Sequence, residues 1–352
     1  MATRQHDSGA VFRKHWGKDD YLKSNDYKTV TDEERAKRHL DAPELNEAYY
    51  DMITDLYQRG WGNKFHFCGY QSGESWETAQ ARHDHFLALK LGIQPDWKVV
   101  DMGCGIGGPA REIAAFTGCQ ITGINISPLH VERGTEINKS VGLDDQVKLV
   151  NGNFMEMPFE VESFDAAYGI EAICCGPDML KTYQEAFRVL KPGGKLGTYE
   201  WVITPKYDDE DEKHRKARYE IERGGSVPHL RLASEHMDAM REAGFEILFE
   251  EDRALAKANP VPWWHSLAAL HAPTWRDWWQ AFQLRPSWYH FCYAIVKVMY
   301  KLGLTHPAQM EALDTVAECT FGCRDGGRLG CFTPMHMMIA RKPLKPVEKK
   351  TQ

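Results

Sequence analysis

The sequence contains no segment that could span a membrane or direct export. No run of 18 apolar residues occurs in the 352-residue chain, and its longest apolar stretch, residues 288–304, is interrupted by Lys297 and Lys301. The first twenty residues are mostly polar and lack the apolar core of a secretory signal peptide. We therefore expect a cytoplasmic protein without a transmembrane segment.

The sequence also lacks the patterns of disulfide scaffolds and of nucleic-acid-binding proteins. Its nine cysteines form no C-x-x-C pair, and their odd number fits reduced thiols better than a disulfide framework. The net charge of −7 and the absence of a basic stripe argue against nucleic acid as a partner. We predict neither a metal site nor a nucleic-acid partner.

The most informative stretch is WKVVDMGCGIGGPARE, residues 97–112. A short apolar run ends in Asp101, four glycines follow within six residues, and a helix-like segment comes next. This order predicts a strand, a tight glycine turn and a helix. Glycine lets a ligand approach the bare backbone, and the helix N-terminus offers unpaired N–H groups to that ligand.

The glycine turn has three interpretations. Gly103, Gly105 and Gly108 satisfy the dinucleotide fingerprint G-x-G-x-x-G. Asp101, however, completes the pattern D-x-G-C-G-x-G, which resembles the opening motif of S-adenosylmethionine (SAM) methyltransferases. A dinucleotide site also needs an acid about 20 residues further on, where the next strand end carries Asn125. The motif favours SAM as the cofactor, with a dinucleotide or a purely structural turn as the alternatives.

Strands and helices alternate regularly around this motif. The expected strands are 97–102, 120–125, 146–151, 164–168 and 195–202, and the expected helices are 109–117, 128–141 and 178–190. This alternation predicts an α/β, Rossmann-like parallel sheet with helices on both faces. Ligands bind such sheets at the carboxyl ends of the strands. The strand ends that carry polar or aromatic residues are Asp101, Asn125, Asn153-Phe154, Glu171 and Tyr199-Glu200-Trp201.

Further segments flank the core. On the N-terminal side we expect a helix over 41–59 that opens with Asp41 and Pro43, an aromatic loop over 60–70 and a helix over 76–91. On the C-terminal side we expect a charged stretch over 206–223 with a solvated helix face, a helix at 234–243, a strand at 245–250, a tryptophan-rich helical cap at 260–304 and a final strand at 332–341.

These observations divide the chain into five parts. They are a polar segment 1–40, N-terminal helices with the aromatic loop 41–92, a SAM-binding core 93–205, a C-terminal region with a helical cap and final strand 206–343, and a tail 344–352. Because aromatic residues on an irregular segment beside a cofactor domain often line a pocket, we interpret the loop 60–70 as a substrate wall rather than core.

Several restricted motifs occur in one order. They are YQRGWGNKFHF, GES, DMGCGIGGPAREIAAFTGC, GIEAI, YEWVIT and FTPMHMMIARKP. Together they resemble the sterol 24-C-methyltransferase family, from about Asp41 to Pro343. The resemblance implies a class I methyltransferase fold, SAM as methyl donor and a sterol with a side-chain double bond as acceptor.

The implied chemistry sets three demands on the site. An alkene must be held in line behind the SAM methyl group, in a long, dry, apolar pocket that protects a carbocation from water. Aromatic faces stabilise that cation, and a base must remove a proton. The aromatic candidates are Tyr57, Trp61, Phe65, Phe67, Tyr168, Tyr199 and Trp201. As base we favour Glu200. Glu171 is either a second candidate or a SAM contact, His66 is either a third candidate or a structural histidine, and Glu74 is a polar contact or a helix cap.

The resemblance also assigns the cofactor residues. Asp101 meets the methionine ammonium, directly or through water, and the backbone of Gly103, Cys104 and Gly105 follows the methionine and ribose. Asn125 binds the ribose hydroxyls, and Asn153 and Phe154 flank the adenine. The chain departs from the family in carrying Asn153 for an aspartate and Ile173-Cys-Cys-Gly-Pro177 for a segment with threonine and histidine.

The second departure leaves the acceptor open between a Δ24 sterol and another polyprenoid alkene such as squalene. A sterol-binding protein derived from a methyltransferase is the non-enzymatic alternative, which the intact glycine motif argues against. A sterol resides in membranes, so the resemblance implies peripheral contact with the endoplasmic reticulum or another lipid-rich membrane. The cap at 260–304 could dock there, although core packing would also explain its apolar residues. A homo-oligomer is also left open.

Overall fold

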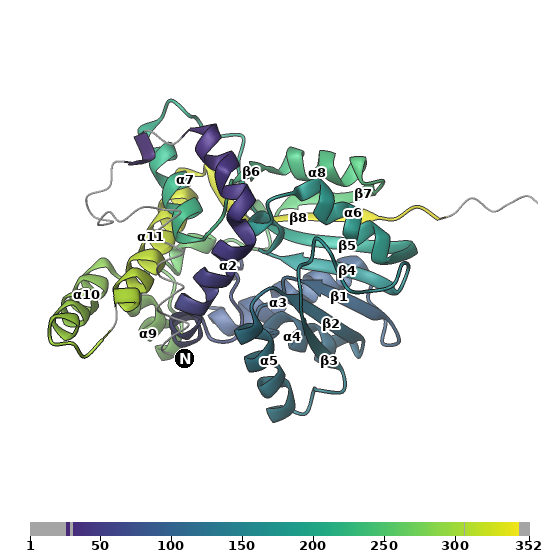
Figure 1. The fold of residues 1–352 in the computed structure, drawn as a ribbon, viewed down its shortest axis with the longest axis horizontal. Coiled ribbons are helices and arrows are strands. Elements are labelled where there is room, and N and C mark those ends of the chain that lie inside the picture. The colour runs from purple at the N-terminus through teal and green to yellow at the C-terminus, as the bar shows by residue number, and fades with distance from the viewer. Residues whose placement is uncertain (1–25, 29–30, 306, 345–352) are drawn as a thin grey trace, which may run out of the picture.

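A central sheet of eight strands organises the protein (Figure 1). This computed structural model describes residues 26–28, 31–305 and 307–344. The strand order is β3-β2-β1-β4-β5-β8-β7, and β6 pairs with β5 beside this path. The strands are β1 (Lys98–Met102), β2 (Gln120–Asn125), β3 (Val147–Asn151), β4 (Phe164–Ile170), β5 (Leu190–Ile203), β6 (Arg231–Leu232), β7 (Glu246–Asp252) and β8 (Phe332–Arg341).

The five strands β1 to β5 run parallel, as predicted, and β8 joins β5 and β7 in antiparallel pairs. The helices linked to this core are α3 (Trp76–Leu91), α4 (Gly108–Thr117), α5 (Pro128–Ser140), α6 (Met179–Val189) and α8 (Ala233–Glu242). The remaining helices are α2 (Asp32–Trp61), α7 (Glu212–Gly224), α9 (Trp275–Gln283), α10 (Pro286–Lys301) and α11 (Pro307–Leu329). Short 3₁₀ turns are η2 (Asp26–Lys28), η3 (Ile173–Cys175), η4 (Arg253–Leu255) and η5 (Trp263–His265).

Helices cover both faces of the sheet because alternate side chains of each buried strand point to opposite faces. On β1, Val99 packs into the cluster formed with α3 and α4, whereas Val100 packs into the cluster formed with α6 and α8. Both valines are fully buried. The strand ends are thereby held in one rigid layer, which fixes the loops that follow them.

The N-terminal helix α2 begins earlier than the sequence predicts. It starts at Asp32 and continues through Pro43 to Trp61, so Asp41 does not open it. The residues before Pro43 include alanine, leucine, glutamate, lysine and arginine, which are strong helix formers and carry the helix past the proline. By contrast, α3 begins where predicted, because the Ser75 side chain accepts a hydrogen bond from the Thr78 N–H at 3.2 Å.

Two further local predictions need correction. The last core strand begins earlier than the expected 195–202: residues 191–194 lie within β5 as a bulge, since Leu190 pairs with Phe164 and Lys195 with Ala166. Glu74 does not cap α3. Its carboxylate instead accepts from Arg82 at 2.8 Å and from the Gln71 N–H at 2.8 Å, which closes the loop before the helix.

The charged stretch that contains α7 is only partly a solvated face, because residues 206–216 are exposed or half-buried whereas the residues that follow are buried. The second half of this helix is buried against α11, and its charges are paired there. Arg218 donates to Glu222 at 3.0 Å, and Arg223 donates to Glu318 of α11 at 2.6 Å. For this second half the prediction of a solvated face was wrong, because charge alone does not reveal an opposing charge 95 residues away.

Breaking the buried pair should destabilise the protein strongly. Arg223→Met would leave the Glu318 carboxylate buried without its partner, which costs about 3–5 kcal/mol in comparable pairs. Urea denaturation measures this loss. The control is Arg241→Met, which removes a pair with Asp238 that is more than half exposed and is worth at most about 1 kcal/mol. Equal stability losses in the two variants would contradict the prediction.

The cap predicted at 260–304 is helical, built from η5, α9 and α10. In Figure 1, α10 lies at the left extremity of the molecule, far from the sheet. Among the residues that the structure describes, no helix is long and apolar enough to cross a membrane.

Candidate active site

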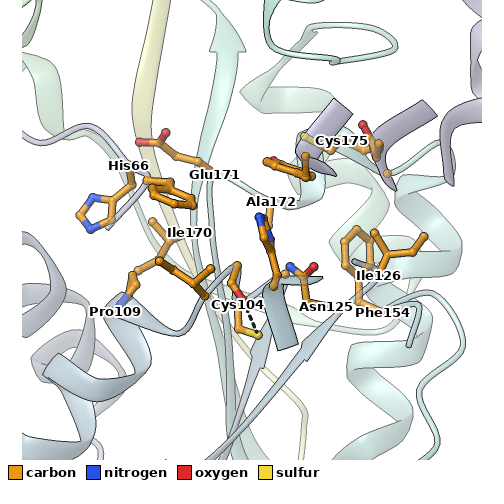
Figure 2. Close-up of a pocket in the computed structure, with 18 of the residues that line it drawn as sticks. His66, Cys104, Pro109, Asn125, Ile126, Phe154, Ile170, Glu171, Ala172 and Cys175 are labelled. Atoms are coloured by element: carbon orange, nitrogen blue, oxygen red, sulfur yellow. Dashed lines mark hydrogen bonds between the residues drawn. The ribbon is translucent and has the colours of Figure 1, made fainter. Parts of the chain in front are cut away.

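The carboxyl ends of β1 to β4 open onto a cavity that we call the glycine-loop cavity. Its wall contains residues 103–106 after β1, Asn125 and Ile126 after β2, residues 153–155 after β3 and residues 170–172 after β4. Figure 2 shows Cys104, Asn125 and Phe154 converging on this space from different strands. The arrangement follows from the parallel sheet, which brings all these strand ends to one edge.

The glycine turn leaves room for a ligand at its centre. Gly103 and Gly105 have φ values of +85° and +51°, which glycine adopts readily and other residues rarely. A Cβ atom built on Gly105 would meet only Phe65 Cδ2, 4.0 Å away, and would otherwise point into open space. The backbone here is therefore a cradle that any side chain would fill.

Other predicted cofactor residues also line this cavity. The side-chain oxygen of Asn125 accepts from the Ser127 N–H at 2.9 Å, which fixes the amide and leaves its NH₂ group for a ligand. The Asn153 oxygen accepts from the Met155 N–H at 2.9 Å, and the ring of Phe154 stands beside it. These residues and the glycine turn fit a nucleoside with hydroxyl acceptors and an aromatic base.

Asp101 lies behind the glycine turn rather than in the cavity wall. Its buried carboxylate accepts from the Tyr168 hydroxyl at 3.0 Å. Burial raises the pKa of this carboxyl to about 7, and the Tyr168 hydrogen bond opposes that shift. Tyr168, predicted as a substrate contact, lines neither of the cavities described here and instead orients Asp101.

A second cavity, which we call the aromatic cavity, adjoins the first. Its wall includes Tyr49, Tyr50, Tyr57, Trp61, Phe65, Phe67 and Trp201. Neighbouring rings contact one another edge-on or tilted, such as Tyr57 with Phe65 at 5.5 Å and Phe67 with Trp201 at 5.9 Å between centroids. Five predicted residues, Tyr57, Trp61, Phe65, Phe67 and Trp201, lie in this wall.

Tyr199, the remaining aromatic candidate, does not line the aromatic cavity. Its ring stacks on His83 of α3 at a centroid distance of 3.7 Å, in the core between α3 and the sheet. The strand period of two puts Tyr199 and Trp201 on the same face of β5, so the extent of α3 over that face separates them. Trp201 lies two residues further along β5 and reaches the aromatic cavity beyond the end of α3, whereas Tyr199 is covered by that helix.

The two cavities share a wall formed by Tyr50, Phe65, His66, Glu171 and Cys175. Figure 2 shows His66 and Glu171 together on one side of the glycine-loop cavity, opposite Asn125 and Phe154. Glu171 is the acidic residue common to both walls. A group bound in one cavity and a group bound in the other would therefore both lie near this carboxylate.

Glu171 is held in an uncommon conformation. Its φ is +53°, which is rare for a residue with a side chain, and such outliers cluster at functional sites. One carboxylate oxygen accepts from the Phe67 N–H at 2.7 Å, and the other accepts from Trp201 Nε1 at 2.6 Å. Burial raises the pKa of Glu171 to about 7, against the lowering effects of His66 and of these two donors.

His66 is a buried, fully engaged side chain. Its Nδ1 donates to the Phe67 carbonyl at 2.9 Å, and its Nε2 lies 3.1 Å from the Asp84 carboxylate. Burial disfavours the charged ring, but Asp84 outweighs burial and raises the pKa of His66 above its usual value. A positively charged imidazole beside Glu171 favours the carboxylate form of that residue and is unsuited to accept a proton itself.

Glu200, which the sequence favoured as the base, lines neither the glycine-loop cavity nor the aromatic cavity. It is fully buried, and its carboxylate accepts from the backbone N–H groups of Cys174 at 2.9 Å and Ile173 at 3.3 Å. Glu200 therefore holds the turn η3 in place. Because neighbouring strand residues point to opposite faces, Trp201 reaches the aromatic cavity and Glu200 does not.

Several wall residues escaped the sequence analysis. Tyr49 and Tyr50 belong to an apolar helical stripe that resembles ordinary core packing, and Cys319 and Thr320 come from α11, far along the chain. Only the i, i+1 pair of tyrosines could have hinted at a second function for α2. Within the described part of the chain, no group of three or more His, Cys, Asp or Glu residues could hold a metal ion.

Comparison with known proteins identifies the family. Residues 100–198 match a family described as methyltransferase domain, and residues 279–344 match one described as sterol methyltransferase C-terminal. The sterol 24-C-methyltransferase of Debaryomyces hansenii is 42% identical over 316 residues, which cover 89% of this chain and 84% of that protein. The cycloartenol-C-24-methyltransferase of Arabidopsis thaliana is 41% identical over 312 residues, which cover 89% of this chain and 90% of that protein.

A solved structure supports the fold. The geranyl diphosphate C-methyltransferase of Streptomyces coelicolor A3(2), solved with S-adenosyl-L-homocysteine, superposes with a TM-score of 0.59 over 86% of this chain and 98% of that one, at 18% identity. The fold is that of class I SAM-dependent methyltransferases, as predicted. Together with the identity to curated relatives over most of its length, this shows that the chain belongs to the sterol 24-C-methyltransferase family of SAM-dependent enzymes.

Proposed function

We propose that this enzyme transfers a methyl group from SAM to carbon 24 of a Δ24 sterol and releases a 24-methylene sterol. The observation that carries the proposal is the meeting of two cavities at Glu171, in a chain of this family. One cavity has the glycine cradle and polar strand ends of a nucleoside site. The other has the aromatic wall that an apolar alkene requires.

The glycine-loop cavity fits SAM. Gly103, Cys104 and Gly105 would pass their backbone along the methionine and ribose, and the Asn125 NH₂ group would donate to the ribose hydroxyls. The negative charge of Asp101 behind the turn would favour the methionine ammonium. When bound, SAM supplies an electrophilic methyl group.

The aromatic cavity would bind the sterol side chain and protect the cation formed on it. Attack by the alkene would form the bond between carbon 24 and the methyl group as the bond from that methyl group to sulfur breaks, and a positive charge would be left on carbon 25 while S-adenosylhomocysteine is released. The faces of aromatic rings attract such a charge by about 0.5–2 kcal/mol each. The apolar wall, in which Phe67 contacts both Trp61 and Trp201, would exclude the water that would otherwise capture the cation.

Glu171 is the proposed base. After a hydride moves from carbon 24 to carbon 25, the new methyl group loses a proton to the Glu171 carboxylate, and the electrons of that C–H bond form the methylene double bond. The Phe67 and Trp201 donors hold the carboxylate in position. His66 acts as a positioning residue, because its positive charge keeps part of Glu171 ionised despite burial.

The pH dependence of turnover should change when the hydrogen bond from Trp201 to Glu171 is removed. Because the pKa of Glu171 is raised to about 7, the base is protonated below that pH and turnover should rise as the pH increases through it. Trp201→Phe keeps an aromatic ring but removes the donor, so this rise should move upward by about one pH unit. Trp97→Phe, outside both cavity walls, is the control for the pH profile of kcat. An unshifted pH profile of kcat in Trp201→Phe would mean that the ionisation of Glu171 does not determine the rate.

The activity itself is tested by a labelled-methyl transfer assay. Purified protein and SAM are offered Δ24 sterols, a 24-methylene sterol and squalene, and the products are identified by mass spectrometry. We expect transfer to a Δ24 sterol. Transfer to none of them, with SAM bound normally, would reject alkene methylation and favour a sterol-binding protein.

One observation favours a second acceptor. Cys175, which stands where the family often has a histidine, lines both cavities, and Cys174 lines the aromatic cavity. A thiol is smaller and less polar than an imidazole, so this wall accommodates a more apolar chain such as squalene. Either acceptor partitions into lipid, so we also propose peripheral contact with the endoplasmic reticulum or another lipid-rich membrane.

A further inference from the structure

The helix α10 is the most conspicuous feature that the proposed chemistry leaves unexplained. It is 16 residues long and predominantly apolar, yet Tyr289 is its one buried side chain. Tyr289 ties it to α11 by donating to Asp314 at 2.6 Å. An apolar helix normally buries a face against its own protein. Here most of the apolar surface faces outward.

The exposed apolar side chains form a single surface across two helices. On α9 they occur at i, i+3 and i+4, and on α10 at i, i+4 and i+7, so each set occupies one helix face. We call this the α9–α10 surface, and its members, which are 44–82% exposed, are Trp275, Trp278, Trp279, Phe291, Ile295 and Val298.

Ring contacts join the two halves of this surface. Trp279 lies 6.0 Å from Trp288, and Trp288 lies 5.5 Å from Phe291, between ring centroids. The α9 tryptophans are therefore continuous with the α10 stripe rather than scattered. A contiguous exposed apolar patch marks an interaction site, whereas single exposed apolar residues need no explanation.

The exposed charges within residues 275–304 are basic, and one of them, Arg276, pairs with Glu77 of α3 at 3.0 Å. Residues 275–304 contain four basic residues, Arg276, Arg285, Lys297 and Lys301, and one acid, Asp277, which is buried. The chain as a whole carries a net charge of −7. A locally basic, tryptophan-rich helical pair on an acidic protein matches the chemistry of a lipid interface. Tryptophan prefers the headgroup level, and lysine attracts anionic headgroups.

We propose that the α9–α10 surface docks the enzyme on bilayers that contain anionic lipids, with its tryptophans and the α10 stripe in the headgroup region. This deepens the proposed function, on which it rests, by naming the surface through which a membrane-resident acceptor is reached. A second copy of the chain is the competing occupant. The basic charge favours lipid, because two copies of one basic surface would repel each other.

The test uses a triple variant, Phe291→Gln, Ile295→Gln and Val298→Gln, which keeps good helix formers on α10. Vesicles of phosphatidylcholine with about 30 mol% phosphatidylserine are floated with the full-length protein, and brominated lipid reports tryptophan depth by fluorescence quenching. The matched control is Leu89→Gln, Val161→Gln and Leu255→Gln, which removes three apolar side chains outside the surface that are even more exposed than those changed on α10.

We expect the wild type and the control to float, with binding weakened by salt, and the α10 variant to partition about tenfold or more weakly. Flotation of the α10 variant at wild-type level would overturn the proposal. So would a wild type that does not float but self-associates in sedimentation velocity through this surface.

Activity separates this proposal from the proposed function. With sterol in detergent micelles, the α10 variant should turn over like the wild type, and with sterol in vesicles it should be slower. A wild type inactive in both formats would reject the proposed function, while the flotation result would still decide the docking proposal by itself. If the α10 variant and the wild type turn over sterol in vesicles equally fast, the docking proposal is contradicted and the proposed function is not.

Discussion

Glu171→Gln is expected to lower kcat by about 10²–10⁴-fold, because it removes the group proposed to take the proton. The amide is the same size, so the affinity for S-adenosylhomocysteine should change little. One amide oxygen can still accept from Phe67 or Trp201, but the NH₂ group faces the other donor. Turnover with a Δ24 sterol and calorimetric binding of S-adenosylhomocysteine measure the two effects separately.

The products of this variant carry a second signature. If methylation still occurs and no base receives the proton, the cation survives longer and is lost by other routes. We therefore expect a larger share of alcohol or isomeric alkene among the products, detected by mass spectrometry. A variant with normal turnover and an unchanged product ratio would remove Glu171 from the mechanism.

Glu200→Gln is the informative comparison. Its carboxylate holds η3 through Ile173 and Cys174, so any loss of activity should accompany a lower melting temperature. Glu171→Gln disturbs one of two buried hydrogen bonds in the same way, so its melting temperature should fall comparably, but its turnover should fall much further than that of Glu200→Gln. A stable Glu200→Gln protein with strongly reduced turnover would restore the interpretation that the sequence favoured.

The core of the fold could be predicted because its signals are local. The strands at 120–125 and 332–341 lie where β2 and β8 are found, and the helix at 76–91 coincides with α3, which its Ser75 cap begins. Each of these signals comes from periodicity or from capping within a few residues. The start of α2 was missed because Pro43, a common first-turn residue, lies inside a helix made of strong helix formers.

The site was predictable in composition but not in orientation. The glycine turn and the strand ends mark the cofactor cavity, because a parallel sheet brings those ends together. The sequence could not decide among Tyr199, Glu200 and Trp201, since it does not show which strand face α3 covers. Nor could it show that the aromatic cavity is closed by α11 through Cys319 and Thr320, since that contact joins segments far apart in the chain.

Gly105→Val should abolish most of the binding of S-adenosylhomocysteine. The added methyl groups would occupy the open space that the Gly105 cradle faces, and forcing atoms into a fitted site costs roughly 1–3 kcal/mol, or about 5–150-fold in affinity. A β-branched residue at φ +51° adds backbone strain, which could shift the turn and weaken binding for a different reason.

Gly142→Val resolves that ambiguity, because Gly142 has a φ of +70° and a Cβ atom added there would meet no other atom within 4 Å. It carries comparable strain but lies outside both cavity walls. Calorimetry on both variants, at a temperature where circular dichroism shows them folded, should find near-normal affinity in Gly142→Val and a large loss in Gly105→Val. An intermediate loss in Gly105→Ala would follow from its single methyl group. Wild-type affinity in Gly105→Val would mean that the nucleoside does not lie along this turn. The proposed cofactor contacts of Gly103 and Cys104 would then also be rejected.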